Sequence, residues 1–519
     1  YRLFYYAGKN SVIFDNAQML KAGFGTMYEY DEKGLLIRQQ DYDGNTAVYS
    51  YNEDDLVEDI TYTRVGYSVP VTEHYEYNGN GDVNRHVDAD GTVTVYVYDE
   101  EGNLTGTETT DGNVSLPEGT FEKENTNYVS SYTDDTGRTL RFTFDEDRGL
   151  LTKTTDPQNQ ETLYYYDAGE NLIKKQKGNS YTEYAYENGK PVTVRYNTDN
   201  GTVEYHLEYD SFGNVESISV GNQEIVSYEY LPYNDKLHKK TYSNGDCIEY
   251  VYDSAGNLTE VRENGQTAYR WNYTQSGKTG IVTDRNNDVT TRYEYRDDGW
   301  IDREVRSDGT TIDYTFNGAD TVLLSKTVRK DDMVSETSYQ YDSNDRVQSV
   351  VWDDTVKQNV RDGFGRVTQQ QASENGSEVY TAVIVYADKD STHTTNRMES
   401  YTNKRNGTVT SSFSYVYDDS GRIEIIRDRY NGKREYVYDS LGQLTEETNE
   451  EEGVRCEYTY DSGGNILLTK TYSLRTNQLL DTDTYTYGNG NRKDQLTSFN
   501  GNGIVYDSAG HPITYYDGK

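Results

Sequence analysis

The sequence has few of the residues that build most protein cores. Of its 519 residues 33% are hydrophobic, and Tyr supplies 54 of these roughly 171 residues, so all other apolar types make up only about 23% of the chain. A chain this poor in aliphatic residues lies near the composition of disordered proteins. Tyr must therefore provide the buried area that Leu and Val normally contribute, and Tyr and Thr favour strands over helices. Helix bundles and coiled coils are disfavoured.

Basic residues are also scarce. The chain has 50 Lys and Arg against 89 Asp and Glu, which gives a net charge of −39. Nucleic acids and anionic lipids are bound through clusters of Lys and Arg, so neither is an expected partner. No run of about 18 apolar residues occurs, and we therefore expect no membrane insertion.

Cysteine and proline are nearly absent. Cys247 and Cys456 lie 209 positions apart and form neither a disulfide framework nor a CxxC metal pair. A secreted protein poor in cysteine is the simplest interpretation, and a cytosolic one stays open. The chain begins at Tyr1 without Met or a signal segment, so we expect it to be a portion of a longer protein. Only 6 Pro stand against 45 Gly, which indicates many tight turns.

What the chain does have is a repeat of about 21 residues. An aromatic residue ends each segment of the type Tyr-x-Tyr-Asp, with spacings of 21, 22, 21, 22, 21 and 25 residues from Tyr209 to Tyr341 and of 21, 22, 27 and 19 residues from Tyr417 to Tyr506. Two stretches, 99–143 and 361–416, are irregular, and we interpret them as insertions or decayed units. The total is about twenty units. Residues 1–28 are expected to be a degenerate repeat, with Tyr6 to Asn10 as its turn, or a separate lead-in, and residues 29–519 the repeat spiral.

One unit predicts its own local structure. In Tyr250 to Leu258 the two Tyr at i and i+2 share one face of a strand. Asp253 begins a turn where its carboxylate accepts backbone N–H groups, and Gly256 sits where a left-handed conformation is needed. This is a hairpin turn with a Gly bulge. A second turn at Asn264-Gly265 follows, so each unit is two short strands.

Consecutive hairpins of this kind predict an all-β fold, a long antiparallel meander of about forty short strands. Such a ribbon would be far wider than the roughly ten strands at which twisted open sheets curl or split. A propeller would need about twelve blades, above the usual 4–8, and a parallel β-helix would not use two hairpin turns per unit. We therefore expect the ribbon to spiral into a hollow tube or β-shell, with stability spread over many Tyr and Thr cross-strand pairs.

The recurring pattern Tyr-x-Tyr-Asp-x-x-Gly-Asn/Arg-Leu/Val/Ile resembles the YD repeat of the Rhs family, over residues 30–519. The motif residues that carry the resemblance, and that we predict to be the structural repeat motif, are Tyr96, Tyr98, Asp99, Gly102, Tyr250, Tyr252, Asp253, Gly256, Tyr415, Tyr417, Asp418, Gly421, Tyr436, Tyr438, Asp439, Gly442, Tyr458, Tyr460, Asp461, Gly464, Tyr506, Asp507 and Gly510.

The resemblance implies a fold and a role. Members of the family include Rhs toxins, wall-associated polymorphic toxins, the cargo-holding parts of insecticidal Tc toxin complexes, and teneurins. Their repeats wind into a hollow β-shell, which in the toxins encloses a C-terminal effector and in teneurins belongs to an adhesion protein. Leu496 to Tyr515 resembles the lead into the family's Rhs-associated core, with His511 where Asn is usual. That core, with its self-cleaving aspartates, is not within the sequence. Gly-Asn in the repeats favours the wall-associated type.

Other candidate sites have ordinary structural interpretations. Acidic pairs such as Asp54-Asp55 and Asp331-Asp332 are typical of turns and a solvated surface, so a glycosidase pair is not assigned. The six His have no metal or triad spacing, and the Gly-rich segments fit no phosphate-binding motif. Trp271, Trp300 and Trp352 are interpreted as packing residues rather than sugar platforms. Three acidic loops leave only weak calcium binding open, Asp41 to Asn45, Asp88 to Gly91 and Asp481 to Asp483. No catalytic, cofactor-binding or metal residue is predicted.

These observations lead to two hypotheses. In the first, the chain is a non-enzymatic shell of a secreted or surface-displayed bacterial protein, and its partner is an effector domain downstream in the same polypeptide. In the second, the same ribbon is an extracellular adhesion or filament-forming protein whose partners are glycans or like chains.

Overall fold

The structure, a computed structural model, describes residues 26–515 apart from 42–43, 65–68, 112, 124–127, 200, 233–234, 297–298, 318–321 and 491. The described residues form strands joined by short turns and contain no helix. None of them therefore belongs to a helix long and apolar enough to cross a membrane. The segment Tyr6 to Asn10 and most of the expected lead-in lie outside the described residues.

The first half of the chain contains strands β1 to β23. They are β1 Met27–Tyr30, β2 Leu36–Gln40, β3 Thr46–Tyr51, β4 Val57–Thr63, β5 Val71–Tyr77, β6 Val83–Val87, β7 Val93–Tyr98, β8 Leu104–Thr110, β9 Ser115–Lys123, β10 Val129–Thr133, β11 Thr139–Asp145, β12 Leu150–Thr155, β13 Glu161–Tyr166, β14 Leu172–Lys177, β15 Ser180–Glu187, β16 Lys190–Thr198, β17 Gly201–Tyr209, β18 Val215–Val220, β19 Gln223–Tyr230, β20 Leu237–Tyr242, β21 Cys247–Tyr252, β22 Leu258–Glu263 and β23 Gln266–Tyr273.

The second half contains strands β24 to β45. They are β24 Thr279–Asp284, β25 Val289–Tyr295, β26 Ile301–Arg306, β27 Thr311–Phe316, β28 Leu323–Lys330, β29 Met333–Tyr341, β30 Val347–Trp352, β31 Thr355–Arg361, β32 Val367–Glu374, β33 Ser377–Asp388, β34 Thr394–Arg405, β35 Thr408–Tyr417, β36 Ile423–Asp428, β37 Gly432–Tyr438, β38 Leu444–Asn449, β39 Val454–Tyr460, β40 Ile466–Ser473, β41 Leu479–Asn489, β42 Arg492–Phe499, β43 Asn502–Gly503, β44 Val505–Tyr506 and β45 Pro512–Thr514.

The topology is a single antiparallel meander. Strands β1 to β43 belong to one sheet in which each strand pairs with the next along the chain, and β44 and β45 form a separate two-stranded sheet. The hairpin β21–β22 is representative, because its register pairs Tyr250 with Val261 and shifts by one residue between Val251 and Tyr252. That shift is the bulge that the Asp-x-x-Gly segment introduces.

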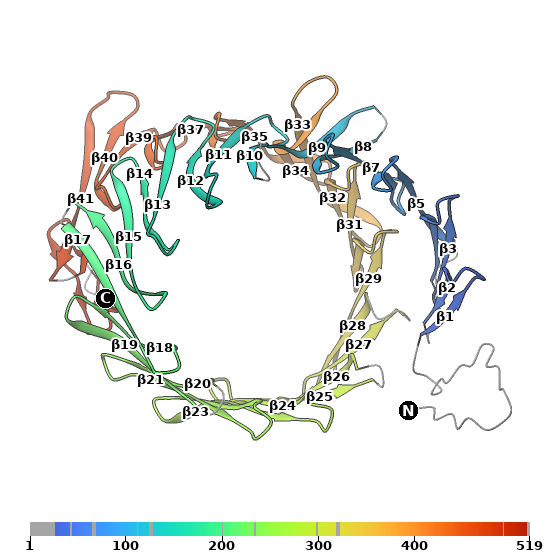
Figure 1. The fold of residues 1–519 in the computed structure, drawn as a ribbon, viewed down its shortest axis with the longest axis horizontal. Coiled ribbons are helices and arrows are strands. Elements are labelled where there is room, and N and C mark those ends of the chain that lie inside the picture. Colours follow the sequence, from blue (N-terminus) through green and yellow to red (C-terminus); the bar gives the residue numbers. More distant parts are fainter. Residues whose placement is uncertain are drawn as a thin grey trace.

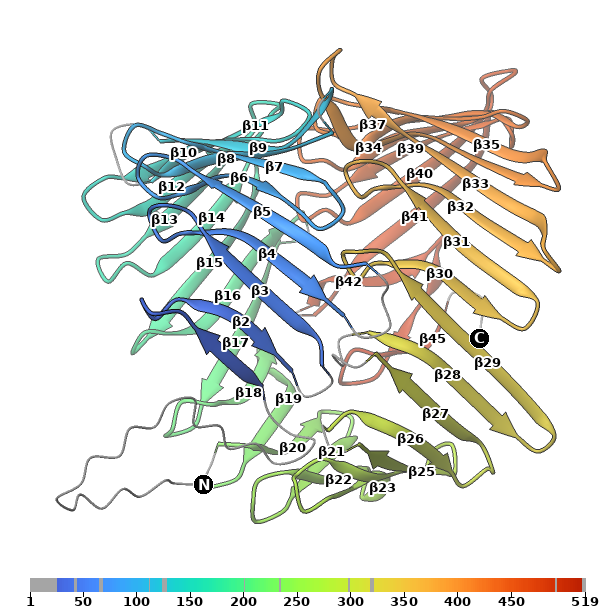
Figure 2. The same cartoon turned by 90° about the vertical axis from the view of Figure 1, so that its right-hand side faces the viewer.

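The meander winds around a central axis as a shell. Seen down this axis, the strands follow a ring from β1 through β12, β16 and β23 to β28, where the chain returns to the side on which it began (Figure 1). The strands from β29 onward form a second turn beside the first, and the side view shows β29 to β35 next to β3 to β9 (Figure 2). The predicted all-β spiral is confirmed.

The shell wall is one sheet thick and therefore has no large core. Its buried apolar residues are mostly small and scattered along the chain, namely Ala47, Leu116, Val203, Val220, Val226, Ala268, Ile312, Val322 and Ala382. Most other side chains in the strands are half-buried. Stability is therefore distributed over many cross-strand contacts instead of being concentrated in a single core.

The two stretches with an irregular sequence still form hairpins. Residues 99–143 contain β8, β9, β10 and the start of β11, and residues 361–416 contain β32 to β34 and most of β35. The hairpin β33–β34 has two strands of 12 residues each and projects from the wall (Figure 1). In these stretches the meander continues although the Tyr-x-Tyr-Asp signature is lost.

Candidate functional site: the seam between the two turns

Each repeat is tied to the preceding one by the second Tyr of its motif. The hydroxyl of Tyr252 donates to the backbone carbonyl of Leu237, which opens the last return strand of the unit before, at 3.0 Å. The same bond recurs from Tyr98 to Val83 at 2.8 Å, Tyr417 to Met398 at 2.8 Å, Tyr438 to Ile423 at 3.0 Å, Tyr460 to Leu444 at 2.7 Å and Tyr506 to Leu496 at 2.6 Å. The first Tyr of the motif lies half-buried on the same face, at Tyr96, Tyr250, Tyr415, Tyr436 and Tyr458.

The Asp and Gly of the motif build the hairpin turn, which we call the YD turn. The Asp253 carboxylate accepts the backbone N–H groups of Ala255 at 2.9 Å and Asn257 at 2.8 Å, and Gly256 has a φ of 85°. Asp99, Asp418, Asp439, Asp461 and Asp507 cap their turns in the same way, and Gly102, Gly421, Gly442, Gly464 and Gly510 have φ values from 78° to 92°. Gly adopts this left-handed conformation without steric strain, and in three equivalent turns Asp55, Glu170 and Asp345 adopt it with φ values of 61°, 66° and 57°.

The two faces of the wall differ in chemistry. The face opposite the motif Tyr carries charged pairs that run from strand to strand, for example Lys174 to Glu183 at 3.5 Å and Arg195 to the same Glu183 at 3.8 Å. Many aspartates lie instead in the turns, at the two edges of the ribbon. The wall faces are therefore partly neutralised, and the acidic excess gathers at the edges.

The hairpin turns at one edge of the second turn of the spiral contact loops at the facing edge of the first turn of the spiral. We call this line of contacts the seam. Its first-turn side consists of loops that join an even-numbered strand to the next strand. The contacting residues are 256 to 298 positions apart in the chain. The pairs are Arg64 with Asp345, Asp88 with Asn344, Asp90 with Arg346, Thr92 with Gly363, Ser115 with Thr392, Asp135 with Asn396, Thr136 with Arg397, Arg138 with Ser420, Ser180 and Asp199 with Ser462, Tyr196 with Asp494, Gln223 with Ser508, and Asn244 with Asp507.

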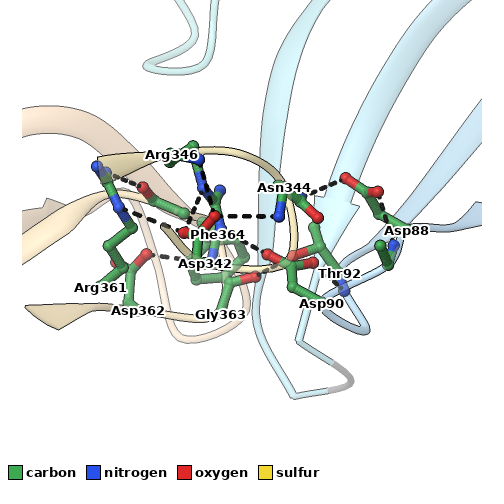
Figure 3. A network of polar contacts seen from close by, with 12 residues as sticks. Asp88, Asp90, Thr92, Asp342, Asn344, Arg346, Arg361, Asp362, Gly363 and Phe364 are labelled. Atoms are coloured by element: carbon green, nitrogen blue, oxygen red, sulfur yellow. Dashed lines mark hydrogen bonds and ion pairs between the residues drawn. The ribbon is translucent and has the colours of Figure 1, made fainter. Parts of the chain in front are cut away.

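In the part of the seam shown in Figure 3, Arg346 lies between acidic residues of the two turns of the spiral. Arg346 donates to Asp342 of its own YD turn at 2.8 Å and to Asp90 of the first turn at 2.6 Å. Asn344 donates to Asp88 at 2.7 Å. Without Arg346, Asp90 would lose this cation, and Asp342 would keep Arg361 at 3.8 Å.

The electrostatics of this network follow from its burial. Burial opposes the charged form of Asp90, but hydrogen bonds from Thr92 and Arg346 outweigh it and lower the pKa of the carboxyl. Burial also opposes the charge of Arg346, and the hydrogen bonds to Asp342 and Asp90 outweigh it and raise the pKa of the guanidinium. Asp90 and Arg346 are thus held in their charged forms.

Beside this network lies a cavity of about 540 Å³ between the turns. Asp90, Asp111, Asp342, Asp362 and Arg361 are among the residues that line it. Among the described residues, no group of three or more His, Cys, Asp or Glu is arranged to hold a metal ion. The carboxylates of the loops singled out for calcium have protein partners: Asp88 and Asp90 bind across the seam, Asp41 caps Asn45, and Asp483 accepts from Asn500. Cys247 and Cys456 are free thiols.

The motif analysis found the turns but not the seam. The structure places Asp418, Asp461 and Asp507 in YD turns whose residues contact the first turn, whereas Asp99 and Asp253 cap YD turns of the first turn, on its other edge. The residue four positions after the turn Asp does not separate the two sets. In the second turn it is Arg at 346, 366 and 422 but Gln at 443 and Asn at 465, and in the first it is Asn at 103, 171, 214 and 257. This position of the repeat therefore gave no reliable signal for the seam.

Comparisons with known proteins agree with this architecture. The family model RHS Repeat matches residues 77–114 and 438–476. No curated protein matches the chain. A crystal structure of TcdB2-TccC3 without the hypervariable C-terminal region matches with a TM-score of 0.62 and 12% identity, covering 95% of this chain and 36% of that one. Structures of TcdB2-TccC3-TEV and TcdB2-TccC3 match with TM-scores of 0.53 and 0.51, each at 12% identity.

The chain thus contains RHS repeats in the two matched segments, and its fold is similar to that of the TcdB2-TccC3 structures. At 12% identity the solved structures show the fold alone. The chain spans about a third of the length of the TcdB2-TccC3 chains, at 36%, 36% and 34%.

Proposed function

We propose that this chain is the non-enzymatic wall of a container, secreted or displayed at a bacterial surface, that encloses and shields an effector domain carried downstream in the same polypeptide. The observation that supports it most is the seam. Side chains join the second turn of the spiral to the first from Arg64 to Asn244, so the overlapping turns form a continuous wall rather than a loose coil. A wall of paired strands offers no free sheet edge along its length.

A protection experiment tests containment. The native polypeptide, including the segment that follows residue 519, is digested with a protease of broad specificity, and the survival of that segment is followed over time. We expect it to persist far longer than the same segment produced alone. Equal rates of digestion would contradict containment, because a protease cannot reach a segment that a closed wall encloses.

The alternative is an adhesive or filament-forming role, with glycans or like chains as partners. Exposed aromatic side chains at turns of the first turn of the spiral favour it. Phe212 is 72% and Trp300 48% exposed, and the Trp300 ring lies 5.4 Å from that of Phe316 at an interplanar angle of 42°. A glycan array probed with the wild-type chain and with Trp300→Ala distinguishes the two. Binding that is lost in the variant supports adhesion, and the absence of binding counts against it.

A further inference from the structure

The wall is held together by two different kinds of contact. Neighbouring strands within a turn share ladders of backbone hydrogen bonds, as in β39 and β40, whose register pairs seven residues from Val454↔Ser473 to Tyr460↔Ile466. Across the seam, between described residues, backbone pairing is limited to one isolated parallel bridge between Ser115 and His393, in which the N–H of Ser115 donates to the carbonyl of Thr392 at 2.9 Å. The other seam hydrogen bonds described above involve side chains.

The two edges that meet at the seam both carry acidic residues. On the first-turn side these include Asp88, Asp90, Asp135 and Asp199, and on the other side Asp342, Asp345, Asp461 and Asp507. Like charges in proximity repel each other unless a cation lies between them. Arg64 and Arg346 supply that cation, because they reach across the seam to the carboxylates of Asp345 and Asp90. Two further arginines also cross the seam, Arg138 to the carbonyl of Ser420 and Arg397 to the hydroxyl of Thr136.

We infer that the shell opens along the seam, by separation of its two turns, and that the seam arginines are the clasps that keep it closed. The wall within a turn stays intact during this opening, because its strands are joined by continuous backbone ladders. The inference goes beyond the proposed function, since it describes how the wall parts whatever it encloses.

Three backbone amides report directly on the seam. The N–H of Ser115 donates to Thr392, that of Asn396 to the Asp135 carboxylate at 2.9 Å, and that of Ser462 to the Asp199 carboxylate at 3.0 Å. Each of these bonds breaks when the turns separate. Hydrogen exchange resolved to single residues therefore measures opening of the seam at these amides and opening of the wall at amides of β21 and β22.

The test removes the clasps and then replaces them with a covalent one. The clasp variant is Arg138→Gln, Arg346→Gln and Arg397→Gln together. Its matched control is Arg38→Gln, Arg292→Gln and Arg455→Gln, three arginines that bind acids within the wall at 2.7 to 2.8 Å. The covalent clasp is a disulfide between Asp111→Cys and Gly363→Cys, with Cys247 and Cys456 replaced by Ser. An ideal Cβ on Gly363 lies 3.0 Å from the Cβ of Asp111, near the distance of about 3.5 to 4.5 Å in a disulfide.

We expect exchange at the three seam amides to rise roughly tenfold or more in the clasp variant, while amides of β21 and β22 keep their wild-type rates. The control leaves the seam amides unchanged, and the oxidised disulfide restores their protection. Unchanged seam exchange in the clasp variant, an equal rise at the wall amides, or failure of the disulfide to restore protection would each overturn the inference. If the clasp variant does not fold, the wild-type chain with the disulfide decides: slower exchange at the seam alone supports it, and no change refutes it.

Discussion

The hydroxyl of Tyr252 lies 3.0 Å from the backbone carbonyl of Leu237, fifteen residues earlier in the chain, and donates a hydrogen bond to it. The bond joins one repeat to the one before, and it recurs in repeat after repeat along both turns. Because the Tyr252 phenol is partly removed from water, burial raises its pKa above the ordinary value of 10.0. A motif residue that is conspicuous in the sequence thus acts as a tie between successive hairpins.

Removing one of these Tyr hydrogen bonds should lower the stability of the shell by a small but measurable amount. Tyr252→Phe leaves the ring in place and deletes the hydroxyl, and we expect the free energy of unfolding to fall by about 1 kcal/mol. The urea midpoint, measured by circular dichroism, checks this. Tyr165→Phe is the control, because Tyr165 lies on the other face with 42% of its area exposed. A loss of several kcal/mol in Tyr252→Phe would show that stability is concentrated and not distributed.

Substitution of the turn glycine should destabilise the shell more than substitution of the motif Tyr. Gly256 has a φ of 85°, and an added Cβ would lie 2.8 Å from the Lys236 ammonium nitrogen. A β-branched side chain is strained in this conformation, so Gly256→Val should lower the free energy of unfolding by about 2 kcal/mol or more.

The control for that change is Gly256→Asn, because Asn tolerates the left-handed region better than other residues with a Cβ. We expect its loss to be clearly smaller in the same urea titration. Equal losses in the two variants would mean that the contact with Lys236, and not the backbone conformation, sets the requirement for Gly.

Acid should destabilise the shell only at low pH. The side-chain amide of Asn257 and then its backbone N–H lower the pKa of Asp253. At Asp507 burial opposes the charge, but hydrogen bonds from His511 and Asn244 outweigh it and bring the pKa to about 2. A depressed pKa contributes stability that is present above the unfolded value, here 3.8, and is lost as the pH falls through the folded value.

Thermal unfolding between pH 7 and pH 2 measures this dependence. We expect the contribution of the turn carboxylates to the melting temperature to be constant down to about pH 4 and to fall steeply between about pH 4 and pH 2. Asp507→Asn should flatten part of the fall, because Asn does not titrate. A fall complete above pH 5 would contradict the assignment to these aspartates.

Alkali should destabilise the shell through its tyrosines. Burial, and then the nearby Glu73 carboxylate, raise the pKa of Tyr62 to about 12, and burial raises the pKa of Tyr252 and Tyr438 from 10.0. A raised phenol pKa contributes stability that is complete below the unfolded value and is lost as the pH rises through the folded value. Phenolate absorbance at 295 nm should therefore lag behind that of the urea-unfolded chain between about pH 10 and pH 12. Coincident titration curves would contradict burial of the Tyr ties.

The sequence by itself determined the hairpin and its repetition. Asp253, Gly256 and the alternating Tyr250 and Tyr252 lie within seven positions, and a turn, a bulge and one face of a strand depend only on neighbours in the chain. About twenty such units in a row also exclude a flat sheet, so the spiral followed from length. The expectation that the spiral is a hollow shell came from the resemblance to YD repeats.

Only the tertiary structure decided which residues meet between turns. Arg346 and Asp90 are 256 positions apart, and their contact depends on the curvature accumulated over every hairpin between them. A small change in the bend at each repeat would place Arg346 opposite a different loop. The total curvature cannot be read from any single repeat. The seam, with its acidic edges and arginine clasps, is therefore a property of the wound chain and not of its unit.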